Sequence, residues 1–154
     1  MYNTALRIVK DTAEAEDIMQ EAFLKAFTKL SLYKGDATFG SWLKRIVVND
    51  SLSSYQKSKR MEVIPLEHDL YKLEDQEGIS PCDTDSLELK NVLQTIGTLK
   101  ESYRIALTLN LIEGYDYDEM SDILQMTNAN CRTTVSRAKS SLRKKLGVAV
   151  NSNN

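Results

Sequence analysis

Residues that break helices and residues that bind metals are both scarce in this chain. Among its 154 residues there are two prolines, six glycines, two cysteines and one histidine. Runs that alternate Val, Ile and Thr with polar residues are also missing, so the sequence argues against a β-sheet protein and predicts an all-α fold. Cys82 and Cys131 lie too far apart in sequence to suggest a metal motif, and we expect neither a metal nor a cofactor.

Signals for export and for membrane insertion are missing from the sequence as well. The N-terminus has no basic start followed by an apolar run, and no stretch is long and apolar enough to cross a bilayer. We therefore expect a cytoplasmic protein with reduced cysteines and no membrane insertion.

Charge is nearly balanced overall, with 20 Lys and Arg against 22 Asp and Glu, but it is unevenly distributed. Residues 61–86 hold eight acidic residues and a single basic one, Lys72. Residues 1–60 hold ten basic residues against seven acidic ones, and residues 87–154 hold nine against seven. Two basic segments therefore flank an acidic one.

The acidic segment also contains Pro65, Gly78 and Pro81 and shows little hydrophobic periodicity. These features predict a flexible linker between two small helical domains. The expected organisation is a first domain, a linker, a second domain and a disordered tail, at residues 1–60, 61–86, 87–147 and 148–154.

The segment from Glu113 to Leu146 has the pattern of a short helix, a tight turn and a longer helix. Met120, Ile123 and Leu124 share one face of the first predicted helix, and Thr127 or Asn128 is expected to cap the second. An apolar stripe recurs along the second helix at steps of four and three residues, at Cys131, Val135, Ala138, Leu142 and Leu146. This pattern is typical of a helix-turn-helix.

The other side of the second predicted helix suits DNA. The predicted helix as a whole carries six Arg and Lys residues and no acidic residue. Cations contact phosphates, and guanidinium and hydroxyl groups reach base edges, as in a recognition helix of the major groove. The alternative is a solvated basic face that favours the helix C-terminus, but this leaves Arg132, near the N-terminus, unexplained. The candidate residues are Arg132, Thr133, Ser136, Arg137, Lys139, Ser140 and Arg143.

An amphipathic helix is predicted near the N-terminus, where Asp11 and Glu14 supply a start signal. Its apolar residues follow helical spacing, and a core helix is the simplest interpretation. The opposite face mixes charge with leucine and also suits a partner. The apolar residues are Ala15, Ile18, Met19, Ala22, Phe23, Ala26, Phe27 and Leu30, and the opposite face holds Asp17, Gln20, Glu21 and Leu24.

Aromatic and basic residues are interleaved in the run FGSWLKRIVVNDSLSSYQKSKR. Such interleaving can serve single-stranded nucleic acid, because bases stack on aromatic rings while cations follow the backbone. The alternative is a core helix whose charged groups are solvated. The apolar positions are Phe39, Trp42, Leu43, Ile46 and Val47, and the run ends with Lys57, Lys59 and Arg60.

As a whole, the chain resembles the extracytoplasmic-function sigma factors of bacterial RNA polymerase. The segment AEAEDIMQEAFLKAF is similar to the core-binding helix of the family's second conserved region, and FGSWLKRIVVND to its promoter-melting segment. LIEGYDYDEMSDIL and the run from Cys131 to Leu146 resemble the helix-turn-helix of its fourth region. The resemblance implies a sigma factor that directs polymerase to promoters and helps to open them.

The resemblance also implies roles for individual residues. Arg45 and Asn49 correspond to positions near the loop that captures an unpaired base of the minus-ten element, and Lys57, Lys59 and Arg60 would contact nearby phosphates. The surface that docks on core polymerase corresponds to Asp17, Gln20, Glu21, Phe23 and Leu24. The face that reads the minus-thirty-five duplex corresponds to Arg132, Thr133, Thr134, Ser136, Arg137 and Lys139. The implied partners are core polymerase and promoter DNA, and an anti-sigma factor is a further partner that the family allows.

The sequence departs from the family at three points. The family has a further stretch before the residues that match Met1, so we expect this chain to start inside the family's first helix. Thr134 stands where the family often has a basic residue, and Gln125 where glycine is common in the turn. These departures bear on local geometry and base preference.

Two other classes of function compete with this interpretation. A dimeric helix-turn-helix regulator would need palindromic DNA and an isologous patch, whereas a sigma factor binds polymerase as a monomer. An enzyme would need a nucleophile and a base, for which Cys131 and His68 are conceivable. We expect no enzyme, because Cys131 lies on the predicted apolar stripe and His68 in the predicted linker.

Overall fold

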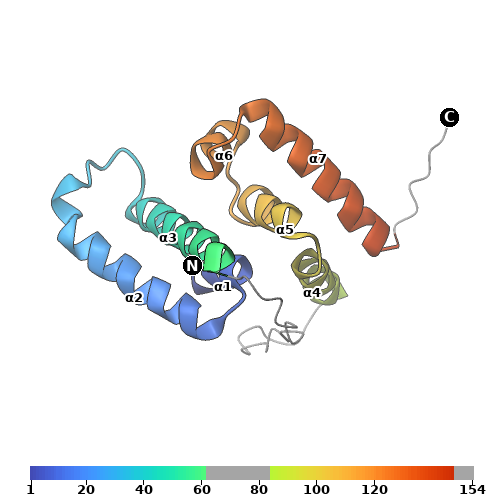
Figure 1. The fold of residues 1–154 in the computed structure, drawn as a ribbon, viewed down its shortest axis with the longest axis horizontal. Helices are drawn as coiled ribbons and strands as arrows, with labels where there is room; N and C mark the ends of the chain where they lie inside the picture. Colours follow the sequence, from blue (N-terminus) through green and yellow to red (C-terminus); the bar gives the residue numbers. More distant parts are fainter. Residues whose placement is uncertain (62–83, 148–154) are drawn as a thin grey trace. The chain divides into compact units, whose positions relative to one another are not determined.

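The computed structural model describes residues 1–61 and 84–147, and these residues form helices joined by short turns (Figure 1). Neither range contains a β-strand, which confirms the predicted all-α fold. The chain divides into two compact units, Met1–Asp69 and Leu70–Asn154. Of the helices in the two ranges, none is long and apolar enough to cross a membrane.

Within residues 1–61, the described part of the first unit, there are three α-helices and one short 3₁₀ turn. The backbone turns between the first two helices at Lys10, which has a φ of 60° and whose amide donates to the Leu6 carbonyl at 2.8 Å. Asp11 then caps the second helix by accepting the Glu14 amide at 2.8 Å, as the start signal predicted. The elements are α1 (Tyr2–Val9), α2 (Thr12–Thr28), η1 (Leu30–Leu32) and α3 (Phe39–Met61).

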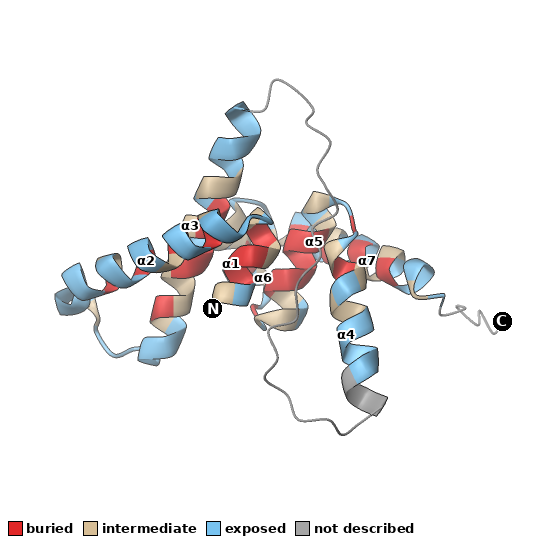
Figure 2. Ribbon diagram, turned by 90° about the horizontal axis from the view of Figure 1, so that it is seen from below, coloured by how far each residue is buried: buried red, intermediate tan, exposed pale blue. Residues whose placement is uncertain are grey.

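Small side chains let α2 approach its neighbours closely. Three of its four buried residues, Ala15, Ala22 and Ala26, are alanines, and the fourth is Ile18. Ala15, Ile18 and Ala22 pack against the buried residues Ala5 and Leu6 of α1 and Val47 of α3. Figure 2 shows these buried faces in red and the second half of α2 largely exposed.

The interpretation of this segment as a core helix is wrong for some of its apolar residues. Phe27 of α2 and Leu30 of η1 fit that interpretation by their spacing, but their exposed fractions are 73% and 49%. Phe23, which the resemblance assigned to polymerase docking, is 43% exposed. The reason is length: α1 has eight residues and α2 has seventeen, so at about 1.5 Å per residue α1 covers only part of α2. α2 therefore contributes mainly small residues to the core of this unit, whereas α1 and α3 contribute larger ones such as Ile8 and Leu43.

The second unit, as described over residues 84–147, has four α-helices and a π-helical turn. The turn follows directly from α5, and the Glu113 amide at its end donates to the Thr108 carbonyl at 3.0 Å. The Lys145 ammonium, at the end of α7, donates to the Thr98 carbonyl at 2.7 Å. This hydrogen bond connects α7 to the turn that follows α4. The elements are α4 (Thr84–Gly97), α5 (Glu101–Leu107), η2 (Thr108–Ile112), α6 (Tyr117–Leu124) and α7 (Asn128–Lys145).

The core of the second unit is built around buried side chains of α5, η2, α6 and α7. Leu107 and Leu109 are completely buried, as are Met120 of α6 and Cys131 of α7, and Val135 is nearly so. α7 packs on both α5 and α6, which holds it in place from two sides. The helix that the sequence predicted to read DNA therefore lies on a rigid support.

Helix extends into both ends of the predicted linker, since α3 runs to Met61 and α4 begins at Thr84. The rest of the acidic segment, with His68 and Cys82, and the predicted tail lie outside the described residues. The domain limits at residues 60 and 87 remain predictions.

Candidate nucleic-acid interface

The turn between α6 and α7 has the geometry of a helix-turn-helix. Asp116 and Glu119 form a capping box at the start of α6, with distances of 2.8 and 2.9 Å. α6 ends at Gln125, whose φ of 53° is the left-handed conformation usually taken by glycine. Thr127, rather than Asn128, caps α7 and accepts the Asn130 amide at 3.1 Å.

α7 separates its packing residues from its outer residues, as the sequence predicted. Cys131, Val135, Ala138 and Leu142 are buried, and Leu146 is half-buried just after the helix. Of the predicted DNA-binding residues, Arg132, Thr133, Ser136 and Arg137 are exposed, and Thr134 and Lys139 are half-buried. The exposed side of the helix therefore presents cations and hydroxyls.

The two threonine hydroxyls of this set are already used as donors. Thr133 donates to the Ala129 carbonyl at 3.0 Å, and Thr134 donates to the Asn130 carbonyl at 2.8 Å. Their oxygens keep lone pairs that can accept from a base amine. In this geometry both threonines are suited to accept hydrogen bonds from DNA and not to donate to it.

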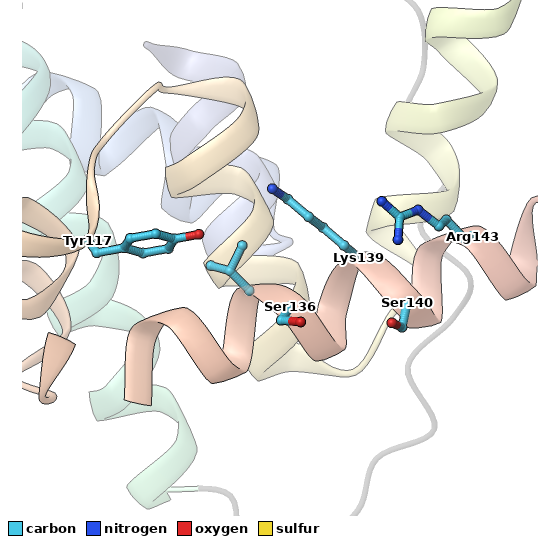
Figure 3. A pocket seen from close by; sticks show the side chains of 6 residues that line it. Tyr117, Ser136, Lys139, Ser140 and Arg143 are labelled. Carbon is cyan, nitrogen blue, oxygen red and sulfur yellow. The ribbon is translucent and has the colours of Figure 1, made fainter. Parts of the chain in front are cut away.

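A shallow pocket lies along α7 where α6 begins. Figure 3 shows Tyr117 of α6 on one side of it and Lys139 and Arg143 of α7 on the other. Ser136 and Ser140 add two hydroxyls to its lining. Two cations and small hydroxyls are groups that can hold a phosphate. Tyr117 was not among the residues predicted from the sequence.

Cys131 has the properties of a core residue and not of a nucleophile. It is completely buried, and burial raises the pKa of its thiol. A raised pKa keeps the thiol protonated at neutral pH, and the thiolate is the reactive form. This environment agrees with the place of Cys131 on the apolar stripe.

On α3 of the first unit, the residues assigned to DNA extend along the helix from Arg45 to Arg60. Arg45 is half-buried and Asn49, one turn later, is exposed. Lys57, Lys59 and Arg60 are exposed near the end of the helix, and the Lys59 ammonium lies 5.4 Å from the centre of the Tyr55 ring. The helix thus carries an amide and several cations along a length of several turns.

Three aromatic rings gather where α3 begins. Tyr33, which precedes the loop, lies with its ring centre 5.3 Å from that of Trp42 and 5.9 Å from that of Phe39. The Tyr33 hydroxyl also donates to the Ala37 carbonyl at 2.5 Å, and this hydrogen bond closes the loop between η1 and α3. Trp42 is half-buried, so it packs in this cluster and keeps part of its ring exposed, and its role with single-stranded nucleic acid stays a prediction. Tyr33 was not among the residues predicted from the sequence.

The residues assigned to polymerase docking divide between two surfaces of α2. Gln20, Phe23 and Leu24 are exposed. Asp17 and Glu21 instead line a groove between α2 and α3, and Lys57, which was assigned to DNA, lines the same groove. The Lys25 ammonium crosses this groove and donates to Asp50 at 2.8 Å.

Further apolar residues extend the exposed surface of α2 beyond the predicted set. Phe27, Leu30 and Leu32 are 73%, 49% and 68% exposed and follow Phe23 and Leu24 along the chain. We define these five residues as the α2 apolar surface. An exposed apolar surface of this kind is typical of a site for a protein partner.

Comparison with known proteins connects these surfaces to one family. Residues 1–61 match the family sigma-70 region 2, and residues 89–142 match sigma-70 region 4. The RNA polymerase sigma-H factor of Pseudomonas aeruginosa is 32% identical over 152 residues, a match that covers 92% of this chain and 77% of that protein. The ECF RNA polymerase sigma factor SigW of Bacillus subtilis is 31% identical over 154 residues, covering 95% and 82%.

The chain is an extracytoplasmic-function sigma factor of the sigma-70 family. It is a subunit that directs RNA polymerase to promoters, and this identity is favoured over the alternative of a dimeric regulator. The region 2 match spans α1, α2 and α3, and the region 4 match ends inside α7.

A solved structure has the same fold as this sigma factor. The sigma factor RpoE of Bartonella quintana, in complex with the anti-sigma factor NepR, superposes with a TM-score of 0.67 at 22% identity. The superposition covers 96% of this chain and 89% of that one. At this level of identity the likeness concerns the fold.

Proposed function

We propose that the sigma factor divides promoter recognition between its two units. α7 reads the minus-thirty-five duplex through Arg132, Thr133, Thr134, Ser136, Arg137 and Lys139. α3 holds the melted minus-ten strand through Arg45, Asn49, Lys57, Lys59 and Arg60. The observation that carries the proposal is the composition of α7, whose side opposite the buried stripe offers cations and hydroxyls to DNA.

The α2 apolar surface supports the assignment of polymerase docking to α2. We propose that Phe23 and Leu24 make the central contacts, that Phe27 extends them, and that Gln20 lies at the rim. Burying apolar side chains against a partner removes them from water, and a few such residues usually dominate binding. Asp17 and Glu21 would contribute from the adjoining groove.

The arrangement on α3 supports strand capture. Asn49 is exposed, and its amide offers a donor and an acceptor to the pairing edge of an unstacked base. The loop closed by Tyr33 and Trp42 precedes this part of α3 and is held by ring contacts. Together, this fixed loop and the exposed Asn49 amide favour the capture of a single base over nonspecific contacts with the DNA strand.

The remaining assignments follow from this role. We propose that the sigma factor works as a monomer in the cytoplasm, where polymerase transcribes, and acts by binding, without catalysis of its own. In the solved structure from Bartonella quintana, the sigma factor RpoE is bound to the anti-sigma factor NepR. By extension, we propose that an anti-sigma factor regulates this chain.

The experiment that tests the proposal is a pull-down of purified bacterial core polymerase, followed in the same tube by transcription from a promoter library. We expect the sigma factor to copurify with polymerase and to produce promoter-dependent transcripts from a shared pair of elements. Binding to palindromic duplexes, together with failure to bind polymerase, would overturn the proposal in favour of a dimeric regulator.

A further inference from the structure

The Arg132 side chain is held in place from two sides although it is exposed. Its Nε donates to the Asn128 side-chain oxygen at 2.8 Å. Its guanidinium carbon lies 5.1 Å from the centre of the Tyr117 ring, within the range of a cation–π interaction. Asn128 belongs to the first turn of α7 and Tyr117 to the first turn of α6, so Arg132 bridges both helices of the helix-turn-helix.

Asn128 is itself held by a second contact. Its side-chain nitrogen donates to an oxygen of Asp118 on α6. The two contacts agree on the orientation of the amide: turned over, it would place its oxygen against the Asp118 carboxylate and its nitrogen against the Arg132 Nε. Asp118, Asn128 and Arg132 therefore form a directed chain of hydrogen bonds across the turn.

These two contacts leave the terminal nitrogens of the Arg132 guanidinium available to DNA. The hydrogen bond to Asn128 uses Nε alone, and the guanidinium carbon lies over the ring of Tyr117. The two terminal nitrogens form the fork that pairs with O6 and N7 of guanine. Holding the side chain before binding lowers the entropic cost of ordering it.

We propose that Tyr117 and Asn128 are positioning residues that set the base preference of Arg132, and that the base read by Arg132 is a guanine. This inference rests on the proposed role of α7 in reading the upstream duplex. Asp118 acts one step further back, since it holds Asn128. The specificity of this promoter contact is therefore shared between α6 and α7, although α7 alone touches the base.

The test uses the full-length sigma factor with core polymerase and a promoter library randomised in the upstream element. We expect Arg132→Ala to reduce the preference for guanine at one position by about tenfold, the loss of a bidentate contact. Tyr117→Leu should reduce the preference at the same position by about three- to fivefold, the size of an exposed cation–π contact. Tyr117→Phe keeps the ring and should keep the preference.

Two further variants separate positioning from a structural role. Asn128→Ala should weaken the same preference, and adding Tyr117→Leu to Arg132→Ala should cause no further loss there, because the two residues act through one contact. Thermal unfolding of each variant reports its effect on the fold. A uniform loss of affinity over all sequences with Tyr117→Leu, or a change at another position, would overturn the inference.

A separate result would show that α7 does not read the upstream duplex. Arg137 lies on α7 but has none of the contacts that hold Arg132. If neither Arg132→Ala nor Arg137→Ala changes the selected upstream element, α7 does not read it and both proposals are overturned. If Arg132→Ala changes the element and Tyr117→Leu does not, only the positioning role is overturned.

Discussion

The two units expose opposite chemistry on the helices that we assign to partners. α7 of the second unit buries an apolar stripe and exposes cations and hydroxyls, whereas α2 of the first unit buries mainly alanines and exposes large apolar side chains. A cationic face suits a polyanion, and its binding weakens with salt. An apolar face suits a protein and gains from the exclusion of water. The difference shows that large apolar residues belong to a core only where other elements are long enough to cover them.

The largest effect is expected from making the α2 apolar surface charged. We expect the double variant Leu24→Asp with Phe27→Asp to bind core polymerase at least about 100-fold more weakly, since a central contact such as Leu24 contributes about 2 kcal/mol or more and Phe27 extends it. Titration of polymerase with labelled sigma factor measures this change.

The matched control for that variant is Leu87→Asp. Leu87 is 69% exposed on α4, close to the 65% of Leu24, and we expect its replacement to leave polymerase binding unchanged. Both variants should retain their unfolding temperatures, because exposed substitutions change stability little. Equal binding by the double variant and the wild type would show that α2 does not dock on polymerase.

The second prediction concerns Arg137 on α7. We expect Arg137→Ala to lower affinity for the preferred minus-thirty-five duplex by about tenfold and to relax the choice of base at one position. Polymerase binding should not change. The control, Lys29→Ala, removes an exposed cation from the first unit. If both variants weaken duplex binding equally, the contribution of Arg137 is net charge and not recognition.

The third prediction concerns Asn49 on α3. Asn49→Ala should slow promoter opening by about five- to tenfold, because the captured base loses its hydrogen bonds. Binding to polymerase and to the upstream duplex should stay as in the wild type. Fluorescence of 2-aminopurine in the minus-ten element reports opening, with Gln56→Ala, an exposed amide on the same helix, as the control. Normal opening by Asn49→Ala would remove this residue from the site.

The smallest effect is expected at the turn of the helix-turn-helix. Gln125→Gly should raise the free energy of unfolding of the second unit by about 0.5–1 kcal/mol, because glycine adopts a φ of 53° without strain. Gly114→Ala, at a φ of 75°, should lower it by about 1 kcal/mol for the same reason. Urea unfolding measures both. A loss of stability in Gln125→Gly would mean that the hydrogen bond from Gln125 to the Asp122 carbonyl outweighs the strain.

The sequence predicted α7 well because one helical period describes both of its sides. Cys131, Val135 and Ala138 mark the packed side, and the outer side follows by elimination. The same reasoning failed for Phe27 and Leu30, because periodicity shows which residues share a face but not what covers that face.

Only one of the two contacts that position Arg132 could be predicted from the sequence. Asn128 and Arg132 are four residues apart on a predicted helix, and such pairs face each other, so this contact could have been foreseen. Tyr117 lies on a different helix, and its contact depends on how α6 packs against α7. The ring of Tyr33 was missed for the same reason, because its neighbours Phe39 and Trp42 lie across a loop.

The division of α7 into packed and outer sides also has an evolutionary consequence. Its core contacts use Cys131, Val135, Ala138 and Leu142, while Thr133, Ser136 and Arg137 remain exposed. Mutations at the exposed positions can alter the promoters that are served at little cost to folding. After gene duplication, a copy of this chain could therefore acquire a new set of target genes through a few substitutions on a scaffold that stays the same.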